Sequence, residues 1–164
     1  VNFFYALDFY LTNTGYPWIW NVVEKVNNLR KVYASLSISS QWLEVYYLTH
    51  AIIGATDFYA KKIAPTDRLY YTQFLQRAEE IISTNYVSLK LDIKLEFLVC
   101  CRILGYASFL SSIIESECAV SLGNDGFLID LYNIKRWKTP TTLAASEHRN
   151  VLYLLSQLDS FRYT

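Results

Sequence analysis

The chain has 164 residues, of which 52% are hydrophobic and 16% are aromatic. A composition this apolar excludes an intrinsically disordered chain, and the length fits one compact domain with a sizeable core. Fifteen Lys and Arg residues balance fifteen Asp and Glu residues, so the net charge is zero. Because phosphate contacts need clustered basic side chains, this balance argues against nucleic acid as the main partner.

Apolar positions recur at helical spacing between scarce prolines and glycines, which predicts helices throughout the chain. In chain order the predicted helices span residues 2–12, 17–36, 40–62, 67–84, 90–117 and about 141–158. The turn NTGYP follows the first helix, and the turn APTD follows the third. The stretch SLGNDG (121–126) is predicted to be a loop. The predicted N-cap residues are Ser39 or Ser40 for the third helix and Thr66 or Asp67 for the fourth.

The chain also resembles itself at two offsets. At an offset of 49, NFFYALDFYL lies over AIIGATDFYA, so that Asp8 matches Asp57. At an offset of 52, LEVYYLTHAIIGA lies over LEFLVCCRILGYA, so that Glu44 matches Glu96 and Arg102 replaces His50. These matches predict repeated helix–turn–helix units, whereas the alternative is chance similarity between apolar helices.

The predicted fold class is therefore all-α, as a single domain over residues 1–164. About three helix-pair units, 1–36, 40–86 and 90–158, would stack as antiparallel helix hairpins in a short α-solenoid or an incomplete α/α toroid. The chain contains no Met and opens inside an apolar run. We therefore expect that residues of the full chain precede Val1.

The cysteine pattern and the hydropathy of the chain bear on its location in the cell. The three cysteines lie in apolar, helix-like sequence without a CxxC spacing: Cys100, Cys101 and Cys118. Their odd number predicts buried, reduced thiols and a cytoplasmic protein. No stretch of eighteen uncharged apolar residues occurs, since Arg102 interrupts 97–114, so neither a membrane span nor a membrane partner is predicted.

The stretch LTHAIIGATDFYAKK (48–62) holds the main candidate site. On a continuous helix one stripe, stepping by three and four, would carry these residues: Leu43, Tyr47, His50, Gly54, Asp57 and Lys61. His50 and Asp57 would share a face about 10.5 Å apart along the axis, with no side chain at Gly54 between them. The sequence therefore predicts a ligand-binding pocket lined by Asp8, Tyr47, His50, Gly54 and Asp57.

Several roles are open to these side chains. His50 could act as a hydrogen-bonding group, a metal ligand or a general base, with Asp57 as its orienter or as a second ligand. The structural alternative is that both are satisfied buried polar groups that cross-link neighbouring helices. A spacing of seven is longer than the i, i+4 spacing of helical zinc sites, so we predict no metal and no cofactor, and we assign no catalytic residue.

Other polar residues are weaker candidates. Glu44 and Glu96 occupy matching places in two long helices, where capping or surface salt bridges are expected rather than paired acid–base carboxylates. His148 lies in the polar stretch ASEHRN and is expected to be solvated.

The stretch LTH-AIIGA-TDF (48–58) resembles an LTH-x5-TDFG motif of an uncharacterised bacterial all-helical family, and TPTTLAA (139–145) resembles a later HTTL-like feature. Tyr59 stands where that pattern has glycine, and Pro140 stands where it has histidine. The resemblance implies a peptide-related role. It carries over no metal or catalytic site, because the second histidine is missing.

The functional prediction is a non-enzymatic binding or accessory module that takes a peptide, a protein or a small apolar ligand. One alternative is an enzyme that uses His50 and Asp57, with or without a metal, for hydrolysis or peptide modification. The other is a purely structural helical domain or a homo-oligomer.

Overall fold

The computed structural model describes residues 38–122 and 143–158. This part of the chain consists of helices joined by turns and loops, and its elements are α3 (Ile38–Ala55), α4 (Arg68–Asn85), the 3₁₀ turn η2 (Tyr86–Ser88), α5 (Leu91–Leu104), α6 (Ser111–Ser121) and α8 (Leu143–Ser156). No strand occurs among these residues, so the all-α prediction is confirmed. The predicted helices 2–12 and 17–36, and with them Asp8, lie outside the described residues.

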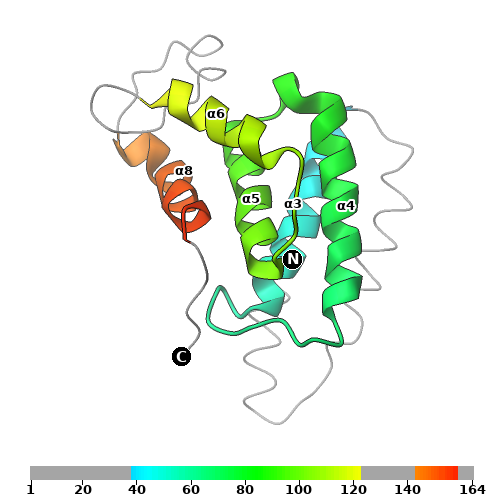
Figure 1. Cartoon of the computed structure of the whole chain (residues 1–164). Helices are drawn as coiled ribbons and strands as arrows, with labels where there is room; N and C mark the ends of the chain where they lie inside the picture. The colour runs from blue at the N-terminus through cyan, green and yellow to red at the C-terminus, as the bar shows by residue number, and fades with distance from the viewer. Residues whose placement is uncertain (1–37, 123–142, 159–164) are drawn as a thin grey trace.

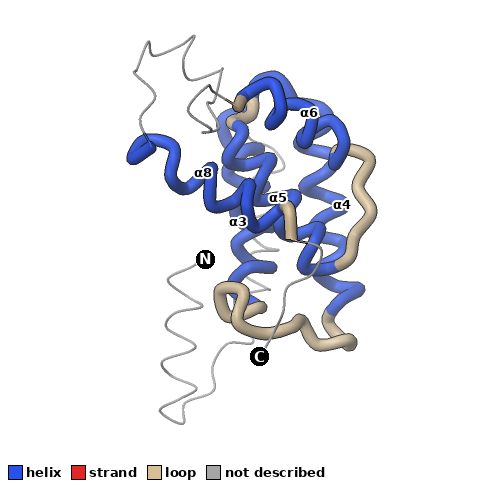
Figure 2. The backbone as a smooth tube through the Cα atoms, turned by 60° about the vertical axis from the view of Figure 1, so that its left-hand side comes forward, coloured by secondary structure: helices blue, strands red, loops and turns tan. Residues whose placement is uncertain are grey.

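The helices α3, α4 and α5 lie side by side, with α6 across one end and α8 on the side of α5 away from α4 (Figures 1 and 2). Cross-helix contacts fix the directions. Asn85 near the end of α4 donates to Gln41 near the start of α3, so these two helices are antiparallel. Arg68 at the start of α4 donates to the Leu104 carbonyl at the end of α5, so α4 and α5 are also antiparallel.

The helices α3 and α5 run in the same direction, because both are antiparallel to α4. The α3–α4 pair is an antiparallel hairpin of the predicted kind. The three-unit repeat stays a prediction, because the first proposed unit, 1–36, lies outside the described residues.

The helix α5 is the centre of the core. It packs against α3, α4, α6 and α8. Eleven of its fourteen residues are buried, a set that includes Phe97, Leu98 and the charged Lys94 and Glu96. A helix that is apolar on almost every side is stable only when neighbours cover it all round, which explains why α5 is the central element.

The structure corrects the predicted end of the third helix. The helix α3 ends at Ala55 rather than at residue 62. Asp57, Phe58 and Tyr59 all have positive φ, at 52°, 52° and 74°, and this left-handed conformation cannot continue a right-handed helix. The side chain of Thr56 supports the turn, since its hydroxyl donates to the Ile53 carbonyl at 2.7 Å and accepts from the Tyr59 amide at 3.0 Å.

The predicted helix 90–117 is likewise two helices, α5 and α6. Gly105 ends α5 with φ 60°, and its amide donates to the Arg102 and Cys101 carbonyls, which are a left-handed C-cap. The predicted helices 67–84 and 141–158 are confirmed within two residues.

The predicted N-cap of the third helix was wrong, whereas Asp67 is the N-cap residue of α4, as predicted. Ser39 and Ser40 lie inside α3, and Asp67 precedes α4 without a side-chain capping bond. No helix in the described ranges combines the length and the hydropathy that a membrane crossing requires.

Candidate functional site

A buried carboxylate on the central helix is the focus of the site. The Glu96 side chain is only 2% exposed. The Thr49 hydroxyl on α3 lies 3.0 Å from its Oε2 and also 3.1 Å from the Val45 carbonyl oxygen. One hydroxyl proton serves one acceptor at a time, so Thr49 alone does not satisfy the carboxylate. Burial of a carboxylate is costly unless further donors reach it.

His50 on α3 approaches the same carboxylate. Its Nδ1 lies 2.8 Å from the Tyr46 carbonyl oxygen one turn earlier and 3.4 Å from Oε2 of Glu96. The Tyr46 ring stacks on the imidazole, with ring centroids 4.6 Å apart and planes 22° apart. The side chain of His50 is 16% exposed, so the ring lies at the edge of the core.

His148 on α8 reaches the same carboxylate from the other side. Its Nε2 lies 3.3 Å from Oε1 of Glu96, while its side chain remains 63% exposed. The two histidines are the only ones in the chain, and both contact Glu96 through different carboxylate oxygens. We name Thr49, His50, Glu96 and His148 the Glu96 cluster.

Two polar contacts hold α8 against α5 and so position His148. At the middle of α8, Nε of Arg149 lies 2.9 Å from Oδ1 of Asp92, near the start of α5. At the end of α8, Nε of Arg102 donates to the Ser156 carbonyl at 3.1 Å. Between them Leu152 is buried in the core. The two pairs show that α8 runs in the same direction as α5.

An aromatic row leads along α3 to the Glu96 cluster. Trp42 meets Tyr46 edge to face, with centroids 6.2 Å apart, and Tyr46 stacks on His50. These residues are spaced by four, so they share one helix face. Trp42 is exposed. Burial, with the nearby carboxylates of Glu96 and Asp92, raises the pKa of Tyr46, so its phenol is neutral.

The structure corrects one expectation about the predicted site residues, the helix face shared by His50 and Asp57. Tyr47 is half-buried and Gly54 is buried near the end of α3. Asp57 follows the end of α3, so it does not share a helix face with His50, and that expectation was wrong. The polar partners of His50 are the Tyr46 carbonyl and Glu96.

Two of the three buried glutamates in the described residues were predicted wrongly. Glu44 and Glu96 were expected at caps or on the surface, yet both are buried. Glu44 pairs with Arg77 on α4, whereas Glu96 contacts both histidines. The signal that could have found them is a lone Glu inside each apolar run, LEVYYL and LEFLVCC.

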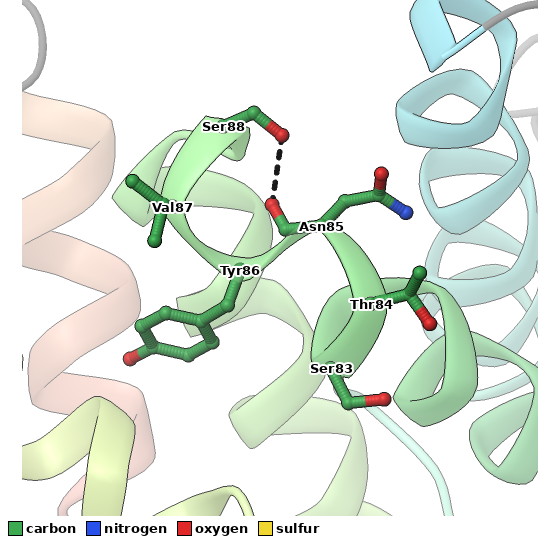
Figure 3. A pocket seen from close by; sticks show the side chains of 6 residues that line it. All are labelled: Ser83, Thr84, Asn85, Tyr86, Val87 and Ser88. Atoms are coloured by element: carbon green, nitrogen blue, oxygen red, sulfur yellow. Dashed lines mark hydrogen bonds between the residues drawn. The ribbon is translucent and has the colours of Figure 1, made fainter.

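A shallow pocket of about 410 Å³ lies at the end of α4, away from this cluster (Figure 3). A single stretch of chain lines it, Ser83 to Ser88. The hydroxyls of Ser83 and Thr84 donate to the Glu80 carbonyl, and that of Ser88 donates to the Asn85 carbonyl. The serine and threonine hydroxyls of the pocket are thus engaged with the backbone of their own segment.

Metal and thiol chemistry find little support in the described part of the chain. No three His, Cys, Asp or Glu side chains there are arranged to hold a metal ion. The three cysteines are free and buried, as predicted: Cys100, Cys101 and Cys118. Burial raises the pKa of each thiol, so none is an activated nucleophile.

Comparison with protein-family models, with curated proteins and with solved structures gives no significant match to this chain. The residues that the structure describes form an all-α fold that carries one buried carboxylate between two histidines.

Proposed function

We propose that this chain is a non-enzymatic binding module that takes a peptide or a small apolar ligand where α3 and α8 flank Glu96. The observation that supports this most is the convergence of both histidines on one buried carboxylate. Hydrogen bonds to fixed acceptors, Glu96 for His148 and the Tyr46 carbonyl for His50, hold each imidazole in one orientation, which prepares its remaining nitrogen for a ligand. His148 is exposed enough for a ligand to reach it.

The aromatic row supplies the apolar part of such a site. Trp42 and Tyr46 give large, rigid contact areas at low cost in conformational entropy, and such residues carry much of the binding energy at interfaces. Tyr47 and Asp57 stay candidate ligand contacts on the same helix and its following turn. The three free, buried thiols support a cytoplasmic location.

The competing role is purely structural, with the Glu96 cluster as a cross-link between α3, α5 and α8. The exposure of His148 argues against this role, because a residue that only cross-links helices does not need an exposed side chain. The two roles differ in what a truncation does. In the binding role, His50→Ala and His148→Ala lower ligand affinity and leave the fold intact. In the structural role, they unfold the protein or loosen α8.

A peptide array tests the proposal. Wild-type protein, His50→Ala and His148→Ala are applied to the same synthetic peptide library, and circular dichroism checks each fold. Glu147→Ala is the matched control, because Glu147 is an exposed neighbour of His148 on α8. We expect both histidine variants to lose at least about tenfold in affinity and the control to keep it. No peptide bound by wild type, or equal binding by all variants, contradicts the proposal.

One observation favours an enzyme as the second candidate. A buried Glu beside an exposed His is the arrangement that orients a general base. The candidate pair is then Glu96 with His148 rather than Asp57 with His50. This role predicts hydrolysis of ester or amide test substrates that is lost in Glu96→Gln and His148→Ala but kept in Asp57→Asn. Hydrolysis that persists in both Glu96→Gln and His148→Ala would show that His148 is not the general base.

A further inference from the structure

We infer that the ligand group received between His50 and His148 is an alkylammonium group, as at the N-terminus of a peptide or on a lysine side chain. The inference rests on the proposed function, because it names the ligand chemistry of the same site. Three features of the Glu96 cluster carry it: the tautomer of each histidine, the charge of the cluster, and the aromatic rings beside it.

The partner of His50 fixes its tautomer. A backbone carbonyl oxygen can only accept a hydrogen bond, and the Tyr46 carbonyl oxygen lies 2.8 Å from Nδ1 of His50. Nδ1 therefore carries the proton and donates it. When the ring is neutral, the lone pair of His50 is on Nε2, which can only accept.

His148 has the opposite tautomer. Its Nε2 lies 3.3 Å from a carboxylate oxygen of Glu96, and a carboxylate also accepts only. Nε2 therefore carries the proton, and the lone pair of the neutral ring is on Nδ1. Each neutral ring thus keeps one acceptor nitrogen, Nε2 on His50 and Nδ1 on His148, and acceptors match a ligand group that donates hydrogen bonds.

The charge of the cluster selects a cation. Within the described residues, the cations on α5 and α8 nearest in sequence to Glu96 and His148 have their own partners. Lys94 contacts both oxygens of Glu117, Arg149 pairs with Asp92, and Arg102 contacts Glu115 and the Ser156 carbonyl. The Glu96 cluster itself contains one carboxylate and no lysine or arginine. An ammonium group supplies three donors and one positive charge.

The aromatic row adds to this preference. The Tyr46 ring lies against His50, and Trp42 lies against Tyr46. Faces of aromatic rings attract cations, with Trp the strongest of them. An ammonium group next to these rings would gain electrostatic attraction while its alkyl chain packs on the ring surface.

The first part of the test needs no ligand. Long-range ¹⁵N–¹H correlation spectra of the full, untagged chain at pH 7.5 report the protonated nitrogen of each of its two histidines, and His148→Gln assigns them. We expect Nδ1–H for His50 and Nε2–H for His148. The opposite tautomers, or two doubly protonated rings, overturn the inference, because doubly protonated rings around Glu96 would select an anion.

The second part measures affinity with matched probes. Three libraries of tripeptide amides are compared: free amino terminus without Lys, N-acetylated without Lys, and N-acetylated with one Lys. We expect acetylation to weaken binding at least about tenfold in the absence of Lys. Recovery by the Lys-containing library assigns the ammonium to a side chain, and no recovery assigns it to the terminus. Equal binding of the first two libraries overturns the inference and leaves the proposed function standing, whereas no binding contradicts both.

Variants connect the result to the Glu96 cluster. Glu96→Gln keeps the shape of the side chain and removes its charge, so we expect it to abolish the preference for the free amino group. Because a buried substitution can impair folding, the exposed His148→Ala serves as the second variant, with Glu147→Ala as its control. A preference unchanged in folded His148→Ala and Glu96→Gln overturns the inference.

Discussion

Arg77 on α4 donates hydrogen bonds to both carboxylate oxygens of Glu44 on α3, with Nε 2.9 Å from Oε1 and Nη2 3.3 Å from Oε2. Glu44 is buried, and the pair joins the two helices of the hairpin. Removal of one partner leaves a buried charge with fewer donors, which costs more free energy than the pair itself contributes.

Arg77→Ala is therefore expected to lower the free energy of unfolding by about 2–4 kcal/mol in denaturant titrations. Arg77 also contacts Glu80, whose side chain is largely exposed. Glu80→Ala is the matched control, with an expected loss of at most about 0.5 kcal/mol. Equal losses in the two variants would show that the buried pair is not what stabilises the hairpin.

Two leucines on α8 differ in burial and give a test of how α8 docks. Leu152 is 2% exposed, whereas Leu154 is 66% exposed. We expect Leu152→Ala to destabilise the protein by about 2–4 kcal/mol, because it leaves a cavity beside α5. Leu154→Ala should change stability by less than about 0.5 kcal/mol. A large effect of Leu154→Ala in the unfolding titration would mean that another surface covers this face of α8.

The Cys118 thiol makes the stability of the folded protein depend on pH in the alkaline range. Burial, followed by the carboxylates of Glu117 and Glu115, raises its pKa from 9.0 to about 11. The folded state holds the neutral thiol, so its contribution to stability is complete below pH 9 and is lost as the pH rises from 9 through 11. We expect Cys118→Ala to show a shallower loss of stability over that range.

The same shift predicts how the thiol reacts. The thiolate is the nucleophile, and a pKa of about 11 in place of 9.0 lowers its fraction at pH 8 about a hundredfold. Alkylation with iodoacetamide at pH 8 should thus be slow in the native protein and fast in denaturant, as followed by mass spectrometry. Rapid modification of Cys118 in the folded protein would contradict its burial.

The turn after α3 gives a prediction in which a substitution stabilises the protein. Phe58 is exposed and has a φ of 52°, which costs a non-glycine residue about 1–2 kcal/mol. Phe58→Gly should relieve this strain and, after the added entropy of the unfolded chain, raise stability by about 0.5–1 kcal/mol. Phe109→Gly is the control, since Phe109 is an exposed loop residue without positive φ. A lower melting temperature for Phe58→Gly would show that its ring contacts outweigh the strain.

Helix periodicity predicted part of this fold well. The spans of α4 and α8 were confirmed within two residues, because apolar periodicity marks them clearly. The ends of α3 and α5 were missed for different reasons. Gly105 is a visible stop signal inside an apolar stretch, whereas the left-handed Asp57 is held there by surrounding hydrogen bonds and has no such signal.

The Glu96 cluster could be predicted only in pieces. His50 was singled out from its apolar surroundings, and His148 is exposed, as expected. Their meeting at Glu96 depends on α3 and α8 both lying beside α5, with a particular register for each pair. Periodicity within one helix has no information about register between helices that are dozens of residues apart in the chain, so the sequence led to Asp57 instead.

The burial of α5 on nearly all sides has a consequence for how the protein can change over evolutionary time. Substitutions on the outer faces of α6 and α8 meet solvent, whereas almost any change within Leu91–Leu104 must be matched by changes in several neighbouring helices at once. This segment should therefore diverge most slowly. A distant relative of this chain should be easiest to recognise by an apolar helix that contains one lysine and, two positions later, one glutamate.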